Sequence, residues 1–167
     1  DGLAALARDQ HGVVSREQLR ALGVTADHVR HQIGARRWAR HGQFVVALHT
    51  GPLTRPAWAW AAALHSAPYG LITAWTALEA RGLHRWRREL IHVAHPRGTT
   101  VAPAPWIARH ESRRLDPDAD RDRTTDLPMV RAARAAVDAA CWSDRADHAS
   151  ALILAVVQQR VAAPSDL

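Results

Sequence analysis

The most constraining feature of this sequence is the segment 15–48, because its caps, apolar positions and turn residues follow one another in the order of helix, turn, helix and hairpin. Ser15 and Gln18 have the spacing of a capping box, in which each side chain accepts a hydrogen bond from the other residue's backbone amide. Gly23 can adopt the left-handed backbone that ends a helix, and Thr25 can cap the next one. The segment therefore predicts two short helices joined by a tight turn.

The second of these helices combines a narrow apolar stripe with a polar, cationic face. Val29 and Ile33 are four residues apart and predict its buried side. The sequence 29–41 contains no acidic residue, and the apolar run 44–48 suits a strand. A cationic helix followed by a cationic hairpin is what groove entry and phosphate positioning require. We therefore predict a winged helix-turn-helix DNA-binding domain over residues 1–51, with DNA contacts from Thr25, His28, Arg30, His31, Gln32, Arg36, Arg37 and Arg40.

The charge of the chain agrees with a polyanionic partner. The formal net charge is +6 and the isoelectric point is near 11.2, which favours nucleic acid. All 22 basic side chains are arginine, a bias that genome composition explains as well as selection for bidentate phosphate contacts. The absence of lysine excludes Schiff-base chemistry, a P-loop lysine and a lysine general base.

Cysteine usage and hydropathy bear on the compartment. Cys141 is the single cysteine, which excludes an internal disulfide and a zinc site built on several thiolates, and which suits a reducing compartment. The sequence lacks an apolar run of the roughly 18 residues that a membrane helix needs, and its start lacks a signal-peptide pattern. We expect a cytoplasmic protein with no membrane partner.

A second domain is expected from residue 52 to 167, because Gly51 and Pro52 mark a linker. Its pattern predicts a small helix-plus-sheet domain, and the whole chain is expected to be α+β. The expected helices are 54–65, 72–81 and two after residue 130, and the expected strands are 89–95, 106–111 and 126–130.

Three finer expectations concern this second domain. Val130, Ala133, Val137, Ala140 and Cys141 are spaced to share the buried face of one helix, and a serine at position 143 is expected to cap the last helix. The segment 112–123 alternates arginines with aspartates, which indicates a solvated, self-neutralised loop.

We predict no catalytic residue, no metal site and no cofactor. His28 and His31 are three residues apart, as metal ligands can be, but the sequence offers no evident third ligand. The aspartates of 116–122 lack the central glycine and closing glutamate of a calcium loop, and no nucleophile elbow is present. The chain is therefore expected not to be an enzyme.

Aromatic and basic residues outside the first domain have two interpretations each. Trp58, Trp60, Trp75, Trp86 and Trp106 could stack bases, but their helical and strand spacings favour a role in the core. The run Arg85, Trp86, Arg87, Arg88 forms a second basic patch, which either extends a DNA footprint or faces an acidic partner.

Several short motifs, in their order along most of the chain, resemble the AbiEi-type antitoxins of type IV toxin-antitoxin (abortive-infection) pairs, in the branch of actinobacterial winged-helix regulators. They are the winged helix itself, Pro52-Leu53-Thr54, Arg81-Gly82-Leu83, the stretch 91–99 (IHVAHPRGT), Leu115-Asp116-Pro117 and the stretch 127–134 (LPMVRAAR). The sequence departs from the family at 43–46, where relatives usually read Arg-Gly-Val-Tyr and this chain reads Gln-Phe-Val-Val.

The resemblance implies a transcriptional regulator that represses its own promoter through the first domain, with double-stranded DNA as its partner. It also implies a second domain that counters a nucleotidyltransferase-like toxin without binding it stably. The alternative is a protein-interaction or recognition module of a larger Vsr-like nuclease-related protein, with no catalysis of its own. Many relatives continue into such a nuclease domain, so nuclease activity is not carried over to these residues.

Overall fold

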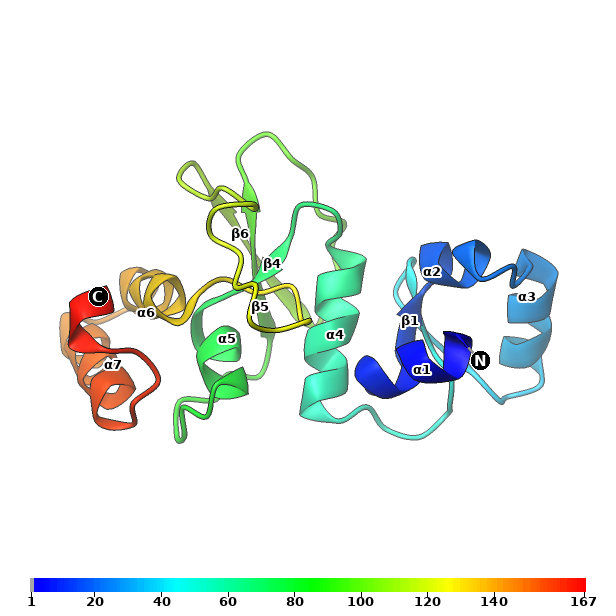
Figure 1. Cartoon of the computed structure of the whole chain (residues 1–167), viewed down its shortest axis with the longest axis horizontal. Coiled ribbons are helices and arrows are strands. Elements are labelled where there is room, and N and C mark those ends of the chain that lie inside the picture. Colours follow the sequence, from blue (N-terminus) through cyan, green and yellow to red (C-terminus); the bar gives the residue numbers. More distant parts are fainter. Residues whose placement is uncertain (1) are drawn as a thin grey trace. The chain divides into compact units, whose positions relative to one another are not determined.

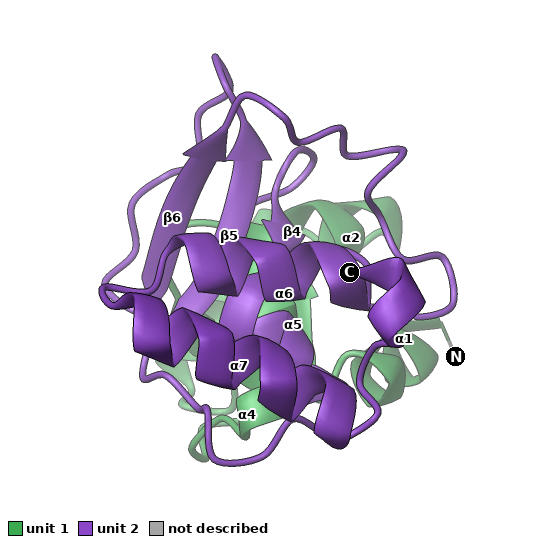
Figure 2. Ribbon diagram, turned by 90° about the vertical axis from the view of Figure 1, so that its left-hand side faces the viewer, with its two compact units in different colours: residues 1–65 green, residues 66–167 purple. Residues whose placement is uncertain are grey.

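The computed structural model describes residues 2–167 and has an α+β fold (Figure 1). The chain divides into two compact units, of which the first ends at His65 and the second runs from Ser66 to Leu167 (Figure 2). Among the described residues there are seven α-helices and two three-stranded sheets. Each unit has one of the sheets.

The first unit contains one antiparallel sheet with short helices around it. Its strand order is β1-β3-β2, and β3 lies in the middle, so Val46 faces both Val14 and Arg40 in register. The elements are α1 (Gly2–Asp9), β1 (Val13–Ser15), α2 (Arg16–Ala21), α3 (Ala26–Gly34), β2 (Ala39–His41), β3 (Val45–Ala47) and α4 (Arg55–His65).

The structure confirms the expected starts of α2 and α3. The Ser15 hydroxyl accepts from the Gln18 backbone amide at 3.0 Å, and Gln18 Oε1 accepts from the Ser15 backbone amide at 2.8 Å, which completes the capping box. Gly23 has φ +78°, and Thr25 accepts from the amide of His28 at 3.2 Å. Because these interactions are local, the sequence alone was sufficient to predict them.

A small apolar cluster holds α2 and α3 on the sheet. Val14, Leu19, Val29 and Val46 are its buried members. Trp38 and Ile33 pack against them from the edge. Because Val29 and Ile33 face this cluster, the opposite side of α3 is left to solvent.

The helix α4 belongs with the first unit, so the compact units divide after His65 rather than at the linker near residue 51. It contacts β1 and β3 along a surface of small buried alanines, which permit close approach to the sheet. Its rings also reach the hairpin: Trp58 lies edge-on to His41 at 5.2 Å between centroids, and His65 lies 5.3 Å from Phe44.

The second unit has a mixed sheet in the order β4-β5-β6, in which β4 is antiparallel to β5 and β5 is parallel to β6. The helix α5 packs on β5, and α6 packs against both α5 and α7 (Figure 2). The elements are β4 (Leu71–Ile72), α5 (Ala74–Ala80), β5 (Ile91–Pro96), β6 (Ile107–Ser112), α6 (Ala132–Cys141), α7 (Ala146–Gln158) and a short 3-10 turn (Pro164–Asp166).

The third strand of this sheet is not the one that the sequence predicted. Residues 126–130 form only isolated bridges, one of them between Met129 and Ile72, because Pro128 has no amide to donate to a ladder. The edge strand is instead Leu71–Ile72, which the sequence placed partly in a helix. The Ile72 amide donates to the Pro128 carbonyl at 2.9 Å and the Ile72 carbonyl accepts from the Val130 amide at 2.9 Å, so this segment pairs with β4 at a single residue and does not continue as a ladder.

Two of the five residues that were expected to share a buried face, Val137 and Cys141, are exposed on α6, whereas Val130 is buried as expected. Val137 is 43% exposed and Cys141 is exposed, whereas Asp138 is buried and Arg134 is largely covered. The expected cap of α7 is also wrong: Arg145 precedes that helix, and the Ser143 hydroxyl donates to the Ala139 carbonyl at 2.8 Å. The charged residues of α6 turn inward because they have charged and polar partners there.

Candidate nucleic-acid interface

Five of the eight residues that the sequence selected lie on α3 or at its N-cap. Thr25, His28, Arg30 and His31 are exposed, and Gln32 is half-buried. Arg30 forms an ion pair with Asp27 on the same helix, three residues earlier. The side chain of Gln32 is 3.2 Å from His28 Nε2, so the ring and the amide support one another. The exposed side chains of α3 thus present hydrogen-bond donors and acceptors, with Arg30 as the arginine among them.

The other three selected residues lie between α3 and the β2–β3 hairpin and on that hairpin. Arg36, Arg37 and Arg40 are exposed, and no acidic partner for them occurs among residues 2–167. Arg36 adopts a left-handed backbone with φ +55°, and the amide of Arg37 donates to the Gln32 carbonyl at 3.0 Å. This turn therefore fixes the start of the cationic segment against the end of α3.

The ring of Trp38 joins the two parts of the surface. It is half-buried on the core of the first unit and lies edge-on to His28 at 5.7 Å between ring centroids. The contact between His28 and Trp38 thus links α3 to the segment that carries the three arginines. A short hairpin with few hydrogen bonds gains rigidity from this packing.

A groove between α2 and α3 adds two cations that were not among the predicted DNA contacts. It has a volume of about 450 Å³ and is lined by Arg16, Glu17, Arg20, Val24, Thr25, Ala26 and Val29. Arg16 Nε donates to the Gln43 carbonyl at 3.1 Å, which ties α2 to the turn of the hairpin. The signal available in the sequence was the spacing of Arg16 and Arg20, four apart on one helix face.

His41, at the end of β2, has an environment that keeps its imidazole neutral. Burial lowers the pKa of His41, and the neighbouring His49 lowers it further. Its ring packs on Trp58 as described above. At neutral pH this side chain therefore supports the hairpin by packing and adds no charge to the surface.

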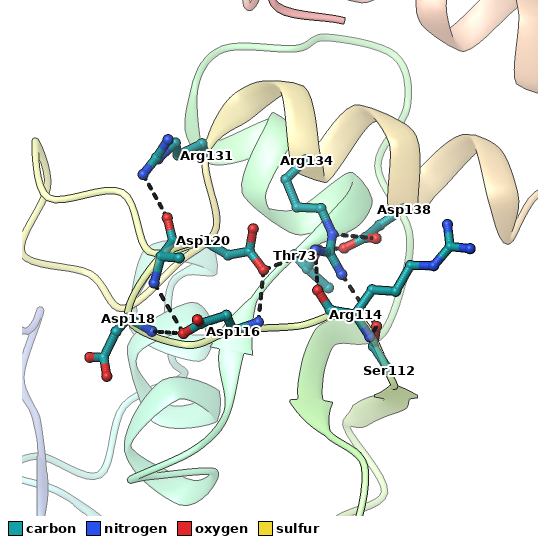
Figure 3. Close-up of polar contacts among 10 residues, drawn as sticks. Thr73, Ser112, Arg114, Asp116, Asp118, Asp120, Arg131, Arg134 and Asp138 are labelled. Carbon is teal, nitrogen blue, oxygen red and sulfur yellow. Dashed lines mark hydrogen bonds and ion pairs between the residues drawn. The ribbon is translucent and has the colours of Figure 1, made fainter.

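The second unit contains a dense polar cluster around Arg134 (Figure 3). Its Nε donates to Asp138 at 2.9 Å, one Nη donates to Asp120 at 2.9 Å and to the Arg114 carbonyl at 3.2 Å, and the other reaches the Ser112 hydroxyl at 3.3 Å. The Thr73 hydroxyl donates to the other oxygen of Asp138 at 2.6 Å. Every nitrogen of this guanidinium is engaged, so the cluster holds the structure together rather than presenting a ligand site.

A second arginine anchors the same loop, residues 112–123. Arg81 Nη2 donates to Asp122 and to the Val130 carbonyl, both at 2.6 Å. Burial would raise the pKa of Asp122, but hydrogen bonds from Thr124 and Arg81 outweigh it and lower the pKa to about 2. The segment expected to be a solvated loop is therefore fixed by two largely covered arginines, although Arg113 and Arg114 remain exposed.

A column of aromatic rings crosses the sheet face beside this cluster. Trp75 meets His92 at 4.8 Å, His92 stacks on His110 at 5.2 Å, and His110 stacks on Trp142 at 3.7 Å between centroids. His92 Nδ1 and His110 Nε2 are 2.9 Å apart. Burial lowers the pKa of His110. The charge of Asp138 raises this pKa, and His95 lowers it further.

Two of the tryptophans that could have stacked bases, Trp60 and Trp75, are buried, as a role in the core requires.

Within residues 2–167, no group of three or more His, Cys, Asp or Glu side chains is arranged to hold a metal ion. None of the helices described there is both long and apolar enough to cross a membrane. No protein-family model matches the chain, and no curated protein matches it either.

Proposed function

We propose that this chain is a DNA-binding transcriptional regulator and that residues 1–51 act as a winged helix-turn-helix. The observation that carries the proposal is the exposed polar face of α3 followed directly by Arg36, Arg37 and Arg40, which lack acidic partners among the described residues. The element order from α1 to β3 and the sheet order β1-β3-β2 support it. In the proposed mode α3 enters the major groove and the arginines hold phosphates.

The residues on α3 are proposed to play two kinds of role. Gln32 and Arg30 are the candidates for base edges, since Gln suits adenine and Arg suits guanine. Arg30 must leave Asp27 to reach a base, and this exposed pair gives up little because solvent screens it. Thr25, His28 and His31 stand on the same face and are proposed to complete the contact surface.

The proposed target is the chain's own promoter, as expected of an autorepressing antitoxin of a type IV toxin-antitoxin system. This part of the proposal is supported by the sequence resemblance and by the presence of a separate second unit. A nucleotidyltransferase-like toxin is the proposed functional partner. Co-expression of the full chain with a neighbouring toxin gene tests this, and unchanged toxicity contradicts it.

The DNA proposal is tested by fluorescence anisotropy with the upstream duplex and a scrambled duplex at two salt concentrations. We expect the upstream duplex to bind more tightly, and this preference to survive the higher salt. Equal binding to both duplexes that salt abolishes would contradict sequence-specific recognition.

Two sets of variants separate phosphate binding from base recognition. Arg36→Ala, Arg37→Ala and Arg40→Ala together are expected to weaken binding to both duplexes and to lower the salt slope by about 0.9 for each phosphate that is no longer bound. Gln32→Ala is expected to reduce the preference for the upstream duplex while leaving the slope unchanged. Arg97→Ala, Arg113→Ala and Arg145→Ala together, in the second unit, are the matched control for removal of three exposed cations. Full affinity in the triple variant would remove the hairpin from the interface.

A further inference from the structure

The second unit carries a basic surface of its own, formed by the 84–90 loop and the end of α7. The 84–90 loop follows α5, and Figure 1 draws the connection from α5 to β5 as a loop at the edge of the unit. Its residues are exposed except for the half-buried Trp86. His84, Arg85, Arg87 and Arg88 make it strongly basic, with Glu89 as its only acid.

A hydrogen bond joins this loop to a segment far away in the sequence. The backbone amide of His84 donates to Gln159 Oε1 at 2.8 Å, across 75 residues. Arg160, which follows directly, is exposed. The loop and the residues after α7 therefore form one surface, which we call the 84–160 surface and define by Arg85, Arg87 and Arg160.

Two of these three arginines occupy backbone positions that favour glycine. Arg85 has φ +69° and Arg160 has φ +58°. Arg160 ends α7 with its amide donated to the Val157 carbonyl at 3.0 Å, the place where helices most often carry glycine. Side chains held on strained backbone point to a role for the side chain itself.

The surface keeps its positive charge after its own ion pair is counted. Arg87 Nε is 3.7 Å from Glu79, but the arginine side chain is 68% exposed, so solvent screens the pair. Trp86, between the arginines, adds a flat ring that is only half-buried. Arginine supplies a planar fork that binds phosphate oxygens in pairs.

We propose that the 84–160 surface binds phosphate groups of double-stranded DNA, as a second contact besides the α3 surface. This inference rests on the proposed function for the identity of the polyanion. Exposed arginines around a half-buried tryptophan fit a continuous phosphate backbone better than they fit a folded acidic protein, whose interfaces have an apolar centre. The contact carries no sequence information and adds affinity and salt dependence.

The test compares two full-length triple variants from which equal charge is removed. The surface variant is Arg85→Gly, Arg87→Ala and Arg160→Gly, in which glycine suits the left-handed positions. The control variant is Arg97→Ala, Arg113→Ala and Arg145→Ala, which removes three exposed arginines of the same unit from outside the surface. Anisotropy titrations with the scrambled duplex are repeated over a series of salt concentrations, and circular dichroism checks that both variants fold.

We expect the slope of log affinity against log salt to become shallower by about 2 to 3 in the surface variant, at about 0.9 for each phosphate that is no longer bound. In the control variant we expect the slope to change by less than about 1. Equal slopes in the two variants would overturn the inference. A labelled polyglutamate that no longer binds the surface variant, while DNA binding is unchanged, would also overturn it and identify an acidic protein partner instead.

These outcomes are distinct from failure of the proposed function. If the Arg36, Arg37 and Arg40 variant binds the upstream duplex as well as the original chain, the α3 surface is not the interface. The surface variant would still report on the second unit, because it is compared with its own control in the otherwise unaltered chain.

Discussion

Replacing Arg134 is the sharpest test of how the second unit is held together. The substitution Arg134→Met keeps the aliphatic stem and removes the guanidinium. It breaks hydrogen bonds to Asp138 and Asp120 and to the oxygens of Ser112 and Arg114. What remains is a carboxylate on Asp138 that is 9% exposed and keeps only the Thr73 hydroxyl among these partners.

The size of the effect follows from these hydrogen bonds and ion pairs. A hydrogen bond to a charged group contributes about 1.5 to 3 kcal/mol, and removing one partner of a buried ion pair costs roughly 3 to 5 kcal/mol. Because Arg134 is 19% exposed and Asp120 is 24% exposed, the lower part of that range applies. We expect a loss of about 3 to 4 kcal/mol in the free energy of unfolding of the second unit. That is a large part of the roughly 5 to 15 kcal/mol that stabilises a domain.

Urea unfolding measures this loss. Tryptophan fluorescence reports on the second unit through Trp75 and Trp142, which lie beside the cluster. With a slope of about 2 kcal/mol per molar urea, the midpoint of this unit is expected to fall by about 1.5 to 2 molar. The control is Arg145→Met, which breaks the exposed pair with Asp147 and is expected to leave the midpoint unchanged.

A midpoint for Arg134→Met that matches the Arg145→Met control would refute the reasoning, because the cluster would then contribute no more than a surface pair. Arg134→Lys separates charge from geometry. Lysine keeps the positive charge but cannot reach all four acceptors, so it is expected to recover only part of the stability.

Three further predictions concern pH and capping. The pKa of Asp122 is lowered from 3.8 to about 2, so its stabilising effect is complete above about pH 4 and is lost as pH falls toward 2. In acid titrations of stability, Asp122→Asn should lose this part of the pH dependence. An unchanged profile would contradict the pairing of Asp122 with Arg81. The pKa of His110 is lowered from 6.5, chiefly by burial, so the second unit should lose stability as pH falls below about 6.5. In thermal melts at pH 5 and 7, His110→Phe should reduce this loss. An equal loss in the variant would assign the effect to another group. Ser15→Ala removes half of the capping box and should cost about 1 kcal/mol in urea unfolding of the first unit, whereas no change would mean that the Gln18 amide finds another acceptor.

The elements of the first unit were predictable because their signals are local. The capping box, the left-handed Gly23 and the Thr25 cap each involve residues within a few positions of one another, and the structure has all three. The candidate DNA contacts on α3 followed from its periodicity, since burial of Val29 determines which side of the helix is covered.

Other features depend on residues far apart in the chain. Pairing of Ile72 with Val93 makes a strand of a segment whose own pattern resembles a helix start, and Pro128 contributes only acceptors to that edge. The groove lined by Arg16 and Arg20 likewise exists only because α2 and α3 pack side by side.

By itself the sequence determined where α2, α3 and α4 begin and which residues of α3 face solvent, because caps and periodicity act over one or two turns. Only the tertiary structure decided that α6 buries its two charged residues and exposes Val137. The physical reason is that a charged side chain can be buried where partners satisfy it, and the partners of Arg134 and Asp138 include Thr73, Ser112 and Asp120, which no helical period connects to α6.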